Sequence, residues 1–301
     1  MKKFMIALSL TLAIGSAITL NSCKKTNSGF DDSVSAQDNA SISKAVDATS
    51  DDAAAATGQY PSFSGKTDGF NNSFFCSGTV VDSLSNNTLT ITYTNATCFG
   101  VTRNGVVTIT SNGTHWKDAG AAVTITFNNL QITDLSDLSS FTINGTHTLT
   151  KETAGLEWKV ILGLEQGPVT RRNQGTLSIT FSNGTRTWTV DRTRSWSNAT
   201  GSNATVTIST EAANSIDAQG TNRYGIAFTN TIVTSIIAEQ SCGFRPYQGE
   251  TTHVADRSVD VKYGTNSAGV QVGNATTCGN GYFISYTKAN GVSGTRFVPY
   301  W

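Results

Sequence analysis

The sequence predicts an all-β protein with one large antiparallel sheet, a meander that forms a curved sheet or a sandwich, behind a short N-terminal helix or tether. From Tyr60 onward, apolar residues recur at every second position with Thr, Ser or Asn between them. This alternation is typical of antiparallel strands that have one face in water. Asn-Gly pairs and other turn residues separate the runs, so the connections are short and sequential strands should pair.

The first 22 residues predict an export signal. Lys2 and Lys3 precede an apolar run that Gly15 interrupts, and this run is too short and too rich in Ser and Thr for a transmembrane helix. It ends in the motif Leu20-Asn21-Ser22-Cys23, which resembles a bacterial lipobox. We therefore expect residues 1–22 to be removed and Cys23 to be acylated with two or three chains, such as palmitate, which anchor stably because each buried CH₂ contributes about 0.8 kcal/mol. An ordinary secretory signal with an unrelated cysteine is the alternative.

Residues 23–58 predict a polar tether that holds the body away from the membrane. Val34, Ile42 and Val46 have a loosely helical spacing, and Ala53 to Ala56 favour helix. We expect a helix over 34–56, with disorder as the alternative. Residues 59–301 then form a single antiparallel β domain.

The charge of the chain excludes a nucleic-acid partner. The full sequence has 21 basic and 21 acidic residues, so loss of Lys2 and Lys3 with the signal leaves 19 against 21, a net charge of −2. Nucleic-acid binding requires a basic surface. Charged residues make up only 14% of the chain, below the usual share of about 25%, and this is typical of an exported β protein with hydroxyl-rich surfaces.

The strands of the predicted sheet are marked by four strongly alternating runs. Their inward residues are Leu89, Ile91 and Tyr93; Val123, Ile125 and Phe127; Leu177, Ile179 and Phe181; and Val259, Val261 and Tyr263. Turns are expected at Asn104-Gly105, Asn112-Gly113, Asn144-Gly145 and Asn183-Gly184, because both residues of the pair tolerate positive φ. Glycine inside a strand can instead mark a bulge or a bend.

Four cysteines besides Cys23 predict disulfides, since an even number in an exported chain is typical of oxidised pairs. Three pairings are open, and we expect Cys76–Cys98 and Cys242–Cys278, which would each join neighbouring strands. A metal site is the alternative. The sequence has no Cys-x-x-Cys motif, and His115, His147 and His253 do not have metal-ligand spacing. We expect these histidines to face solvent and predict no metal and no cofactor.

The segment from Arg186 to Trp196 is the most unusual strand. Its alternate positions place cations and indoles on one face, which consists of Arg186, Trp188, Val190, Arg192, Arg194 and Trp196. We favour a structural reading in which Arg stems lie over buried indoles. In the alternative reading, the face is exposed and binds a glycan or an acidic ligand, with Arg171 and Arg172 extending it.

Motifs along most of the chain resemble those of one protein family. They are Thr90–Thr94 with Cys98, Thr102–Thr110, Asp118–Asn128, Asn144–Thr148, Arg186–Trp188, Arg192–Trp196, Thr221–Gly225, Ser241–Cys242, Val261–Gly264 and Cys278. In this order they are similar to a family of uncharacterised, β-rich outer-membrane lipoproteins of Bacteroidota. The resemblance covers residues 60–285 together with the lipobox and tether. It implies an outer-membrane lipoprotein, and since the family has no known activity, it implies no role for any residue.

Two short motifs predict a modification. Asp32-Ser33-Val34 and Asp82-Ser83-Leu84 resemble the O-glycosylation signal of Bacteroidota, an acid followed by a hydroxyl and an apolar residue. Ser33 is the better site because we expect the tether to be exposed.

The sequence lacks a catalytic motif. It has no Gly-x-Ser-x-Gly elbow, no Gly-rich phosphate loop and no evident pair of carboxylates. We therefore expect a lipid-anchored envelope protein that binds a glycan or another envelope protein, or that serves as a scaffold, without catalysis. The alternatives are a hydrolase of surface polysaccharide or another polymer, and a module that assembles through its sheet edges.

Overall fold

The computed structural model describes residues 32–65, 74–85, 87–136, 138–272, 277–287 and 291–300. The predicted signal peptide and the predicted lipidation site Cys23 lie outside these residues. The chain from residue 31 onward forms one compact unit. None of the helices in the described part combines the length and the apolar character that crossing a membrane requires.

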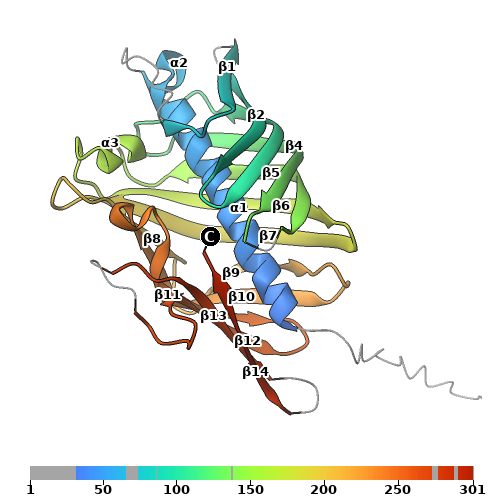
Figure 1. The fold of residues 1–301 in the computed structure, drawn as a ribbon. Coiled ribbons are helices and arrows are strands. Elements are labelled where there is room, and N and C mark those ends of the chain that lie inside the picture. The colour runs from blue at the N-terminus through green and yellow to red at the C-terminus, as the bar shows by residue number, and fades with distance from the viewer. Residues whose placement is uncertain are drawn as a thin grey trace, which may run out of the picture. The chain divides into compact units, whose positions relative to one another are not determined.

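The described part consists of one long helix, three short helical segments and fourteen strands (Figure 1). The helical segments are α1 (Asp32–Gln59), α2 (Pro61–Ser64), α3 (Glu157–Ile161) and the 3₁₀ turn η2 (Gln240–Cys242). The first seven strands are β1 (Thr79–Ser85), β2 (Thr88–Cys98), β3 (Val101–Ser111), β4 (Ala122–Asp134), β5 (Ser140–Lys151), β6 (Val169–Phe181) and β7 (Gly184–Ser197). The others are β8 (Thr205–Ser209), β9 (Ile216–Thr221), β10 (Ala227–Glu239), β11 (Pro246–Val254), β12 (Ser258–Thr265), β13 (Gly281–Thr287) and β14 (Ser293–Pro299).

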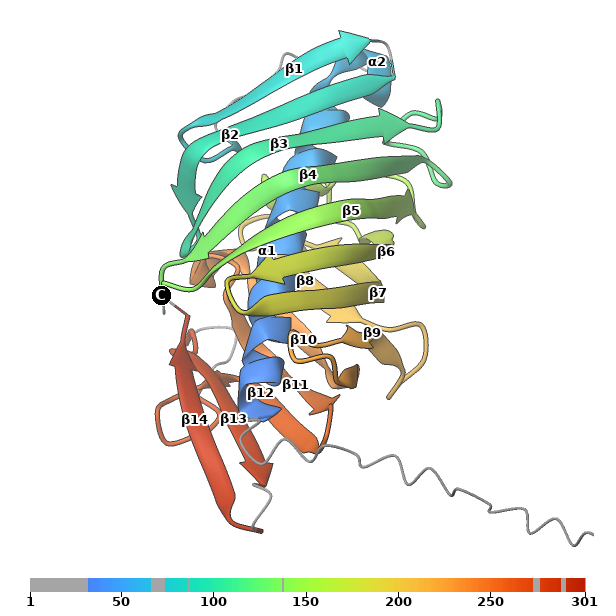
Figure 2. The same cartoon turned by 90° about the vertical axis from the view of Figure 1, so that its right-hand side faces the viewer.

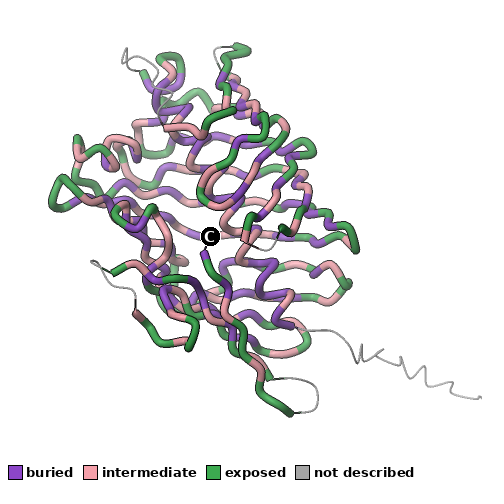
Figure 3. Tube along the Cα trace, viewed as in Figure 1, coloured by how far each residue is buried: buried purple, intermediate pink, exposed green. Residues whose placement is uncertain are grey.

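All fourteen strands belong to a single antiparallel sheet, which confirms the predicted all-β meander. The strands follow chain order from β1 to β14, except that β8 and β9 both lie between β7 and β10. β8 pairs with one end of these two long strands and β9 with the other. Buried and exposed residues alternate along the strands (Figure 3), as the hydrophobic pattern predicts. The architecture is a curved sheet and not a sandwich.

Two of the four predicted Asn-Gly turns are wrong, because these glycines lie inside long strands. Gly105 is in β3 and Gly145 is in β5, with φ of +128° and +120°. A Cβ on Gly145 would lie 2.8 Å from the carbonyl oxygen of Thr176 on β6. Glycine is therefore required where the neighbouring backbones come close, as expected for a bulge or bend. Gly113 and Gly184 do lie in or beside the expected connections.

Helix α1 lies along the concave side of the sheet (Figures 1 and 2). It forms where the sequence predicts a helix, although it begins at Asp32 and ends at Gln59. The prediction that this segment is a spacer outside the body is wrong, because 20 of its 28 residues are buried. The compact unit therefore begins near residue 31 and not at residue 59. Ala, Ser and Thr dominate the helix, and small side chains allow the strands to approach it closely.

The hydrophobic core consists of three clusters around α1. The largest joins α1 residues such as Ile42 and Val46 to the inward residues of β2 to β7. A second cluster lies on β12, β13 and the C-terminal residues and includes Tyr282 and Tyr300. A third lies on β7, β8 and β10 and includes Trp196. Of the two smaller clusters, the second includes Ala36 of α1, whereas the third contains only residues of the sheet and of α3 among those described.

Candidate functional site

The Arg/Trp face of β7 is buried against α1. Trp188 has no exposed surface and Trp196 is 2% exposed. The indole Nε1 of Trp188 donates to Asn39 Oδ1 at 3.0 Å, and Arg186 donates to the Ser35 carbonyl at 2.9 Å. The two indoles therefore share a covered face, as the structural reading expects. The alternative hypothesis of an exposed ligand surface is wrong for Arg186 and Trp188, because α1 covers both side chains. Arg192 and Trp196 are buried too, but they also line the cavity described below.

Further along β7, ion pairs join the strand to α1. Arg192 pairs with Asp47 at 2.7 Å and Arg194 pairs with Asp51 at 2.6 Å. Burial alone would raise the pKa of Asp47, but the guanidinium groups of Arg192 and Arg194 hold it below its usual range. The carboxylates of α1 are thus the counterparts of the cations that the sequence places on one face of β7.

A second group of paired charges joins α1, α3, β5 and β6. Arg171 on β6 pairs with Asp51 at 2.5 Å and lies 3.7 Å from Glu157 on α3. Lys151 on β5 also pairs with Glu157, at 3.1 Å. Burial alone would raise the pKa of Glu157, but Lys151 and Arg171 lower it. Arg172, which has the opposite parity on β6, instead pairs with Asp191 on the outer face of the sheet.

Two of the three histidines are buried, which contradicts the prediction that they face solvent. His147 shares a hydrogen bond with Ser50 at 3.3 Å, and His253 shares one with Ser35 at 2.9 Å. Burial lowers the pKa of each imidazole to about 3, with Arg192 adding to the effect at His147. His115 is exposed in the β3–β4 connection. Within the described residues, no cluster of three or more His, Cys, Asp or Glu could hold a metal ion.

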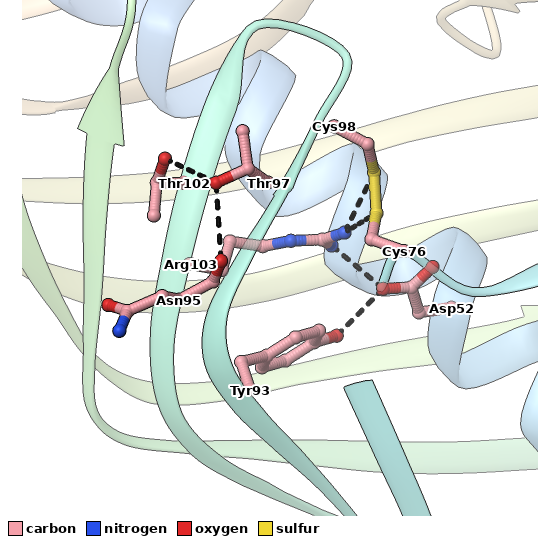
Figure 4. Close-up of a disulfide and its surroundings, with 8 residues drawn as sticks. All are labelled: Asp52, Cys76, Tyr93, Asn95, Thr97, Cys98, Thr102 and Arg103. Atoms are coloured by element: carbon pink, nitrogen blue, oxygen red, sulfur yellow. Dashed lines mark hydrogen bonds and ion pairs between the residues drawn. A yellow bond between two sulfur atoms is a disulfide. The ribbon is translucent and has the colours of Figure 1, made fainter. Parts of the chain in front are cut away.

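The predicted cysteine pairing is confirmed, with disulfides Cys76–Cys98 and Cys242–Cys278. Figure 4 shows Arg103 between the first disulfide and helix α1. Its guanidinium donates to Cys76 Sγ at 3.0 Å and pairs with Asp52 at 2.8 Å. Tyr93 donates to the same carboxylate at 2.9 Å. Burial raises the pKa of Asp52 to about 6, although Arg103 acts to lower it.

A cavity of about 410 Å³ lies between α1 and the C-terminal part of the sheet. One wall is the part of α1 that the sheet does not cover, with Ala40, Lys44, Ala48 and Asp51. The opposite wall is apolar and aromatic. It consists mainly of Trp196, Val206, Ile208, Ile236, Phe244, Tyr263, Tyr282, Val298 and Tyr300. Cavities of this size with apolar walls and a few polar groups are typical of small-molecule sites.

Sequence reasoning missed almost all of this cavity. Its apolar wall consists of ordinary inward strand residues, which the alternating pattern marks only as core. Its helical wall belongs to a segment that the sequence predicts to be a solvated tether. Only Arg171, Arg192 and Trp196 belong both to the cavity wall and to the residues that the sequence singles out.

The carboxylates in the cavity wall are all engaged with cations. They are Asp47, Asp51, Asp52, Asp134 and Glu157, and each lies within 4 Å of an Arg or Lys nitrogen. A hydrolase with paired carboxylates needs one that can hold and release a proton. Asp52 has the raised pKa that this role requires, but it is buried and bonded to Tyr93 and Arg103. The arrangement favours binding over acid–base catalysis.

The two predicted glycosylation sites differ sharply in accessibility. Ser33 lies in the first turn of α1 and is only 1% exposed, so the expectation that it is exposed is wrong. A sugar on its hydroxyl would require the start of the helix to leave the sheet. Ser83 is exposed on β1, which makes it the better candidate of the two.

Comparisons of the chain with protein-family models, curated proteins and solved structures found no match.

Proposed function

We propose that this chain is a lipid-anchored protein of the bacterial outer membrane that binds a small amphipathic molecule without catalysing its conversion. The cavity beside α1 is the observation that carries this proposal. It is large enough for a small ligand, and about nine apolar or aromatic side chains face a polar helix across it. The lipobox motif ending in Cys23 supports the anchor, and the resemblance to outer-membrane lipoproteins supports the location.

The charges at the site support binding over hydrolysis, which is the alternative proposal. A hydrolase of surface polysaccharide would need carboxylates that face the bond to be cleaved. Four of the five carboxylates in the wall have side chains that are 12% exposed or less, and Asp51, at 41%, is bonded to two arginines. The pairs of Asp47, Asp51, Asp52 and Asp134 join α1 to the sheet, and Glu157 joins α3 to it, so the first role of these contacts is structural.

A fluorescence titration tests the proposal. The purified full chain is titrated with N-phenyl-1-naphthylamine, a neutral probe whose emission rises in apolar surroundings. We expect saturable binding by the wild type. Ala48→Phe places a ring in the cavity from the α1 wall and should weaken probe binding by about tenfold or more, which corresponds to about 1.4 kcal/mol.

Ala213→Phe is the matched control, because Ala213 lies exposed in the β8–β9 connection. It adds the same ring outside the cavity and should bind the probe as the wild type does. Unfolding curves establish that both variants are folded. Equal probe binding by a folded Ala48→Phe variant and the wild type, or no saturable binding by any form, would contradict the proposal.

A further inference from the structure

The shape of the cavity favours a chain-like ligand. Its helical wall follows one stripe of α1, marked by Ala40, Lys44, Ala48, Asp51 and Ala55. These positions are three or four residues apart and so lie on one face of the helix. The 15 residue steps from Ala40 to Ala55 span about 22 Å at a rise of about 1.5 Å per residue. A cavity with a volume of about 410 Å³ that extends over this length is long and narrow.

The wall opposite α1 suits the apolar part of a ligand. Tyr282 lies between Tyr263 and Tyr300, with ring centroids 5.7 and 6.2 Å apart. Ile208 and Ile236 continue the surface on β8 and β10. Tyr300 donates its hydroxyl to the Pro246 carbonyl at 2.6 Å, so this polar group is already engaged. The wall therefore offers contact area to a hydrocarbon chain.

The charged side chains in and behind the cavity wall are ion-paired. The wall itself contains four cations, Lys44, Arg103, Arg171 and Arg192, and five carboxylates, Asp47, Asp51, Asp52, Asp134 and Glu157. With Lys151, Arg194 and Asp217, which lie behind the wall, the paired set has six cations and six carboxylates. An additional charge placed beside this balanced set would be buried without a counterion, which is unfavourable. The site therefore disfavours both an anionic and a cationic head group.

Asp51 is the most exposed of the five carboxylates in the cavity wall. Its side chain is 41% exposed, whereas the side chains of Asp47, Asp52, Asp134 and Glu157 are 5–12% exposed. It accepts three bonds from Arg171 and Arg194, and a carboxylate has about four lone-pair sites. One acceptor position remains for a donor from the cavity. A hydroxyl group can donate there without adding charge.

We propose that the cavity selects an uncharged amphiphile with a hydrocarbon chain and a hydroxyl-bearing head, and that Asp51 accepts a hydrogen bond from this head. The inference rests on the proposed binding function and names the chemical class of the ligand. The chain lies along the tyrosine wall, and the balanced ion pairs exclude charged heads.

Competition against the bound neutral probe tests this selectivity. The competitors have one ten-carbon chain and differ only in the head: decan-1-ol, its methyl ether, decanoate and decylammonium, all at neutral pH. Decan-1-ol should displace N-phenyl-1-naphthylamine at the lowest concentration. The two ions should need about tenfold more, equivalent to about 1.4 kcal/mol. The ether has no hydroxyl donor and should fall between the alcohol and the ions.

Two variants change the charge balance in opposite directions. Asp51→Asn leaves Arg171 and Arg194 with excess positive charge and should shift the preference toward decanoate. Lys44→Met leaves Asp134 without the cation it faces at 3.4 Å and should shift it toward decylammonium. Asp191→Asn removes a carboxylate from the outer face of the sheet and should leave the order of the four competitors unchanged.

The outcomes separate the two proposals. If the probe binds but decanoate or decylammonium displaces it as well as decan-1-ol does, the selectivity is wrong and the binding function stands. Unchanged preferences in both folded charge variants would also contradict the selectivity. Absence of saturable probe binding would instead contradict the binding function itself.

Discussion

Arg192 on β7 donates to Asp47 on α1 at 2.7 Å, although 145 residues separate them in sequence. Both side chains are nearly inaccessible, with 2% and 12% of their surfaces exposed. Arg192 also bonds the Ser43 hydroxyl and lies 3.5 Å from Asp217 on β9. This arginine therefore fixes the position of α1 over the sheet, and with it the distance between the two walls of the cavity.

Removal of Asp47 should destabilise the protein strongly. Asp47→Ala leaves Arg192 and Arg194 buried with fewer counterions, and breaking a buried pair costs about 3–5 kcal/mol. Asp191→Ala provides the control, because its pair with Arg172 is partly exposed, at 43% and 32%, and should cost about 0–1 kcal/mol. Urea unfolding of both variants beside the wild type measures the difference. Similar losses in the two variants would show that the α1 contact is not a buried ion pair in solution.

The stability should fall as the pH is lowered from neutral to about 5. His147 and His253 have folded-state pKa values of about 3 against a usual 6.5, so they bind protons mainly in the unfolded state. Each buried histidine should therefore lower the free energy of unfolding by roughly 2 kcal/mol at about pH 5 relative to neutral pH. Asp52, with its pKa raised to about 6, acts in the opposite direction: its stabilisation is complete below about pH 4 and is lost as the pH rises through 6. At about pH 5, Asp52 should therefore add roughly 1 kcal/mol to the free energy of unfolding, which partly compensates the loss from the histidines.

Urea unfolding at the two pH values measures this dependence. The double variant His147→Gln/His253→Gln removes both imidazoles and should show much less loss on acidification. An equally steep loss in the double variant would assign the acid sensitivity to other groups.

The strands could be predicted from sequence because one physical signal, the alternation of apolar and polar residues, determines which face is buried. Leu89, Ile91 and Tyr93 are buried as their spacing predicts. Gly105 and Gly145 misled the prediction because the conformational freedom that suits a turn also suits a bend in a long strand. The sheet therefore has fewer turns than its Asn-Gly pairs suggest.

The location of α1 could not be predicted from hydrophobicity, because the helix has no apolar stripe. Its burial depends on partners far away in sequence, such as Arg186 for Asn39 and Arg194 for Asp51. A signal was nevertheless present. In a chain with few charges, carboxylates gather in one helix and arginines gather on one face of one strand. Taken separately, the carboxylates indicate a solvated tether and the arginines indicate a recognition face. Only when the two groups are matched as ion pairs do they indicate that the helix and the strand pack together inside the protein.

Trp188→Ala should reduce stability by about 3–5 kcal/mol, since the indole is fully buried and its removal leaves a large void. It also removes the hydrogen bond to Asn39. Thermal unfolding beside the wild type provides the measurement, and in a domain of this size each 1 kcal/mol should lower the Tm by about 2–4 °C. Asn39→Ala keeps the indole but removes its acceptor and should have a smaller effect. A Tm shift below about 1 °C for Trp188→Ala would refute the structural role of this face.

Lipidation at Cys23 can be tested independently of the cavity. Cys23→Ala removes the thiol that the lipobox motif presents for acylation, so the variant should accumulate as soluble protein or as unprocessed precursor. Membrane fractionation with intact-mass measurement distinguishes these products from the wild type. A variant that remains in the membrane at the normal mature size would rule out this anchor.

The two disulfides should each contribute about 3–4 kcal/mol, because they close loops of 22 and 36 residues. Loss of Cys76–Cys98 has a further consequence, since Arg103 bonds both Cys76 and the Asp52 carboxylate of α1. Cys76→Ser/Cys98→Ser should therefore weaken probe binding in the cavity as well as stability, because Asp52 and Arg103 lie in the cavity wall. Cys242→Ser/Cys278→Ser is the comparison, since the Sγ atom of Cys278 contacts the Ser241 carbonyl and not a residue that pairs with α1. It should reduce stability while probe affinity in the folded protein is retained.

Peptide mapping without reductant checks the cysteine pairing before these variants are made, and a Cys76–Cys242 link would overturn that pairing. Equal probe affinities in both folded double variants would show that the first disulfide stabilises the sheet without influencing the helical wall of the cavity.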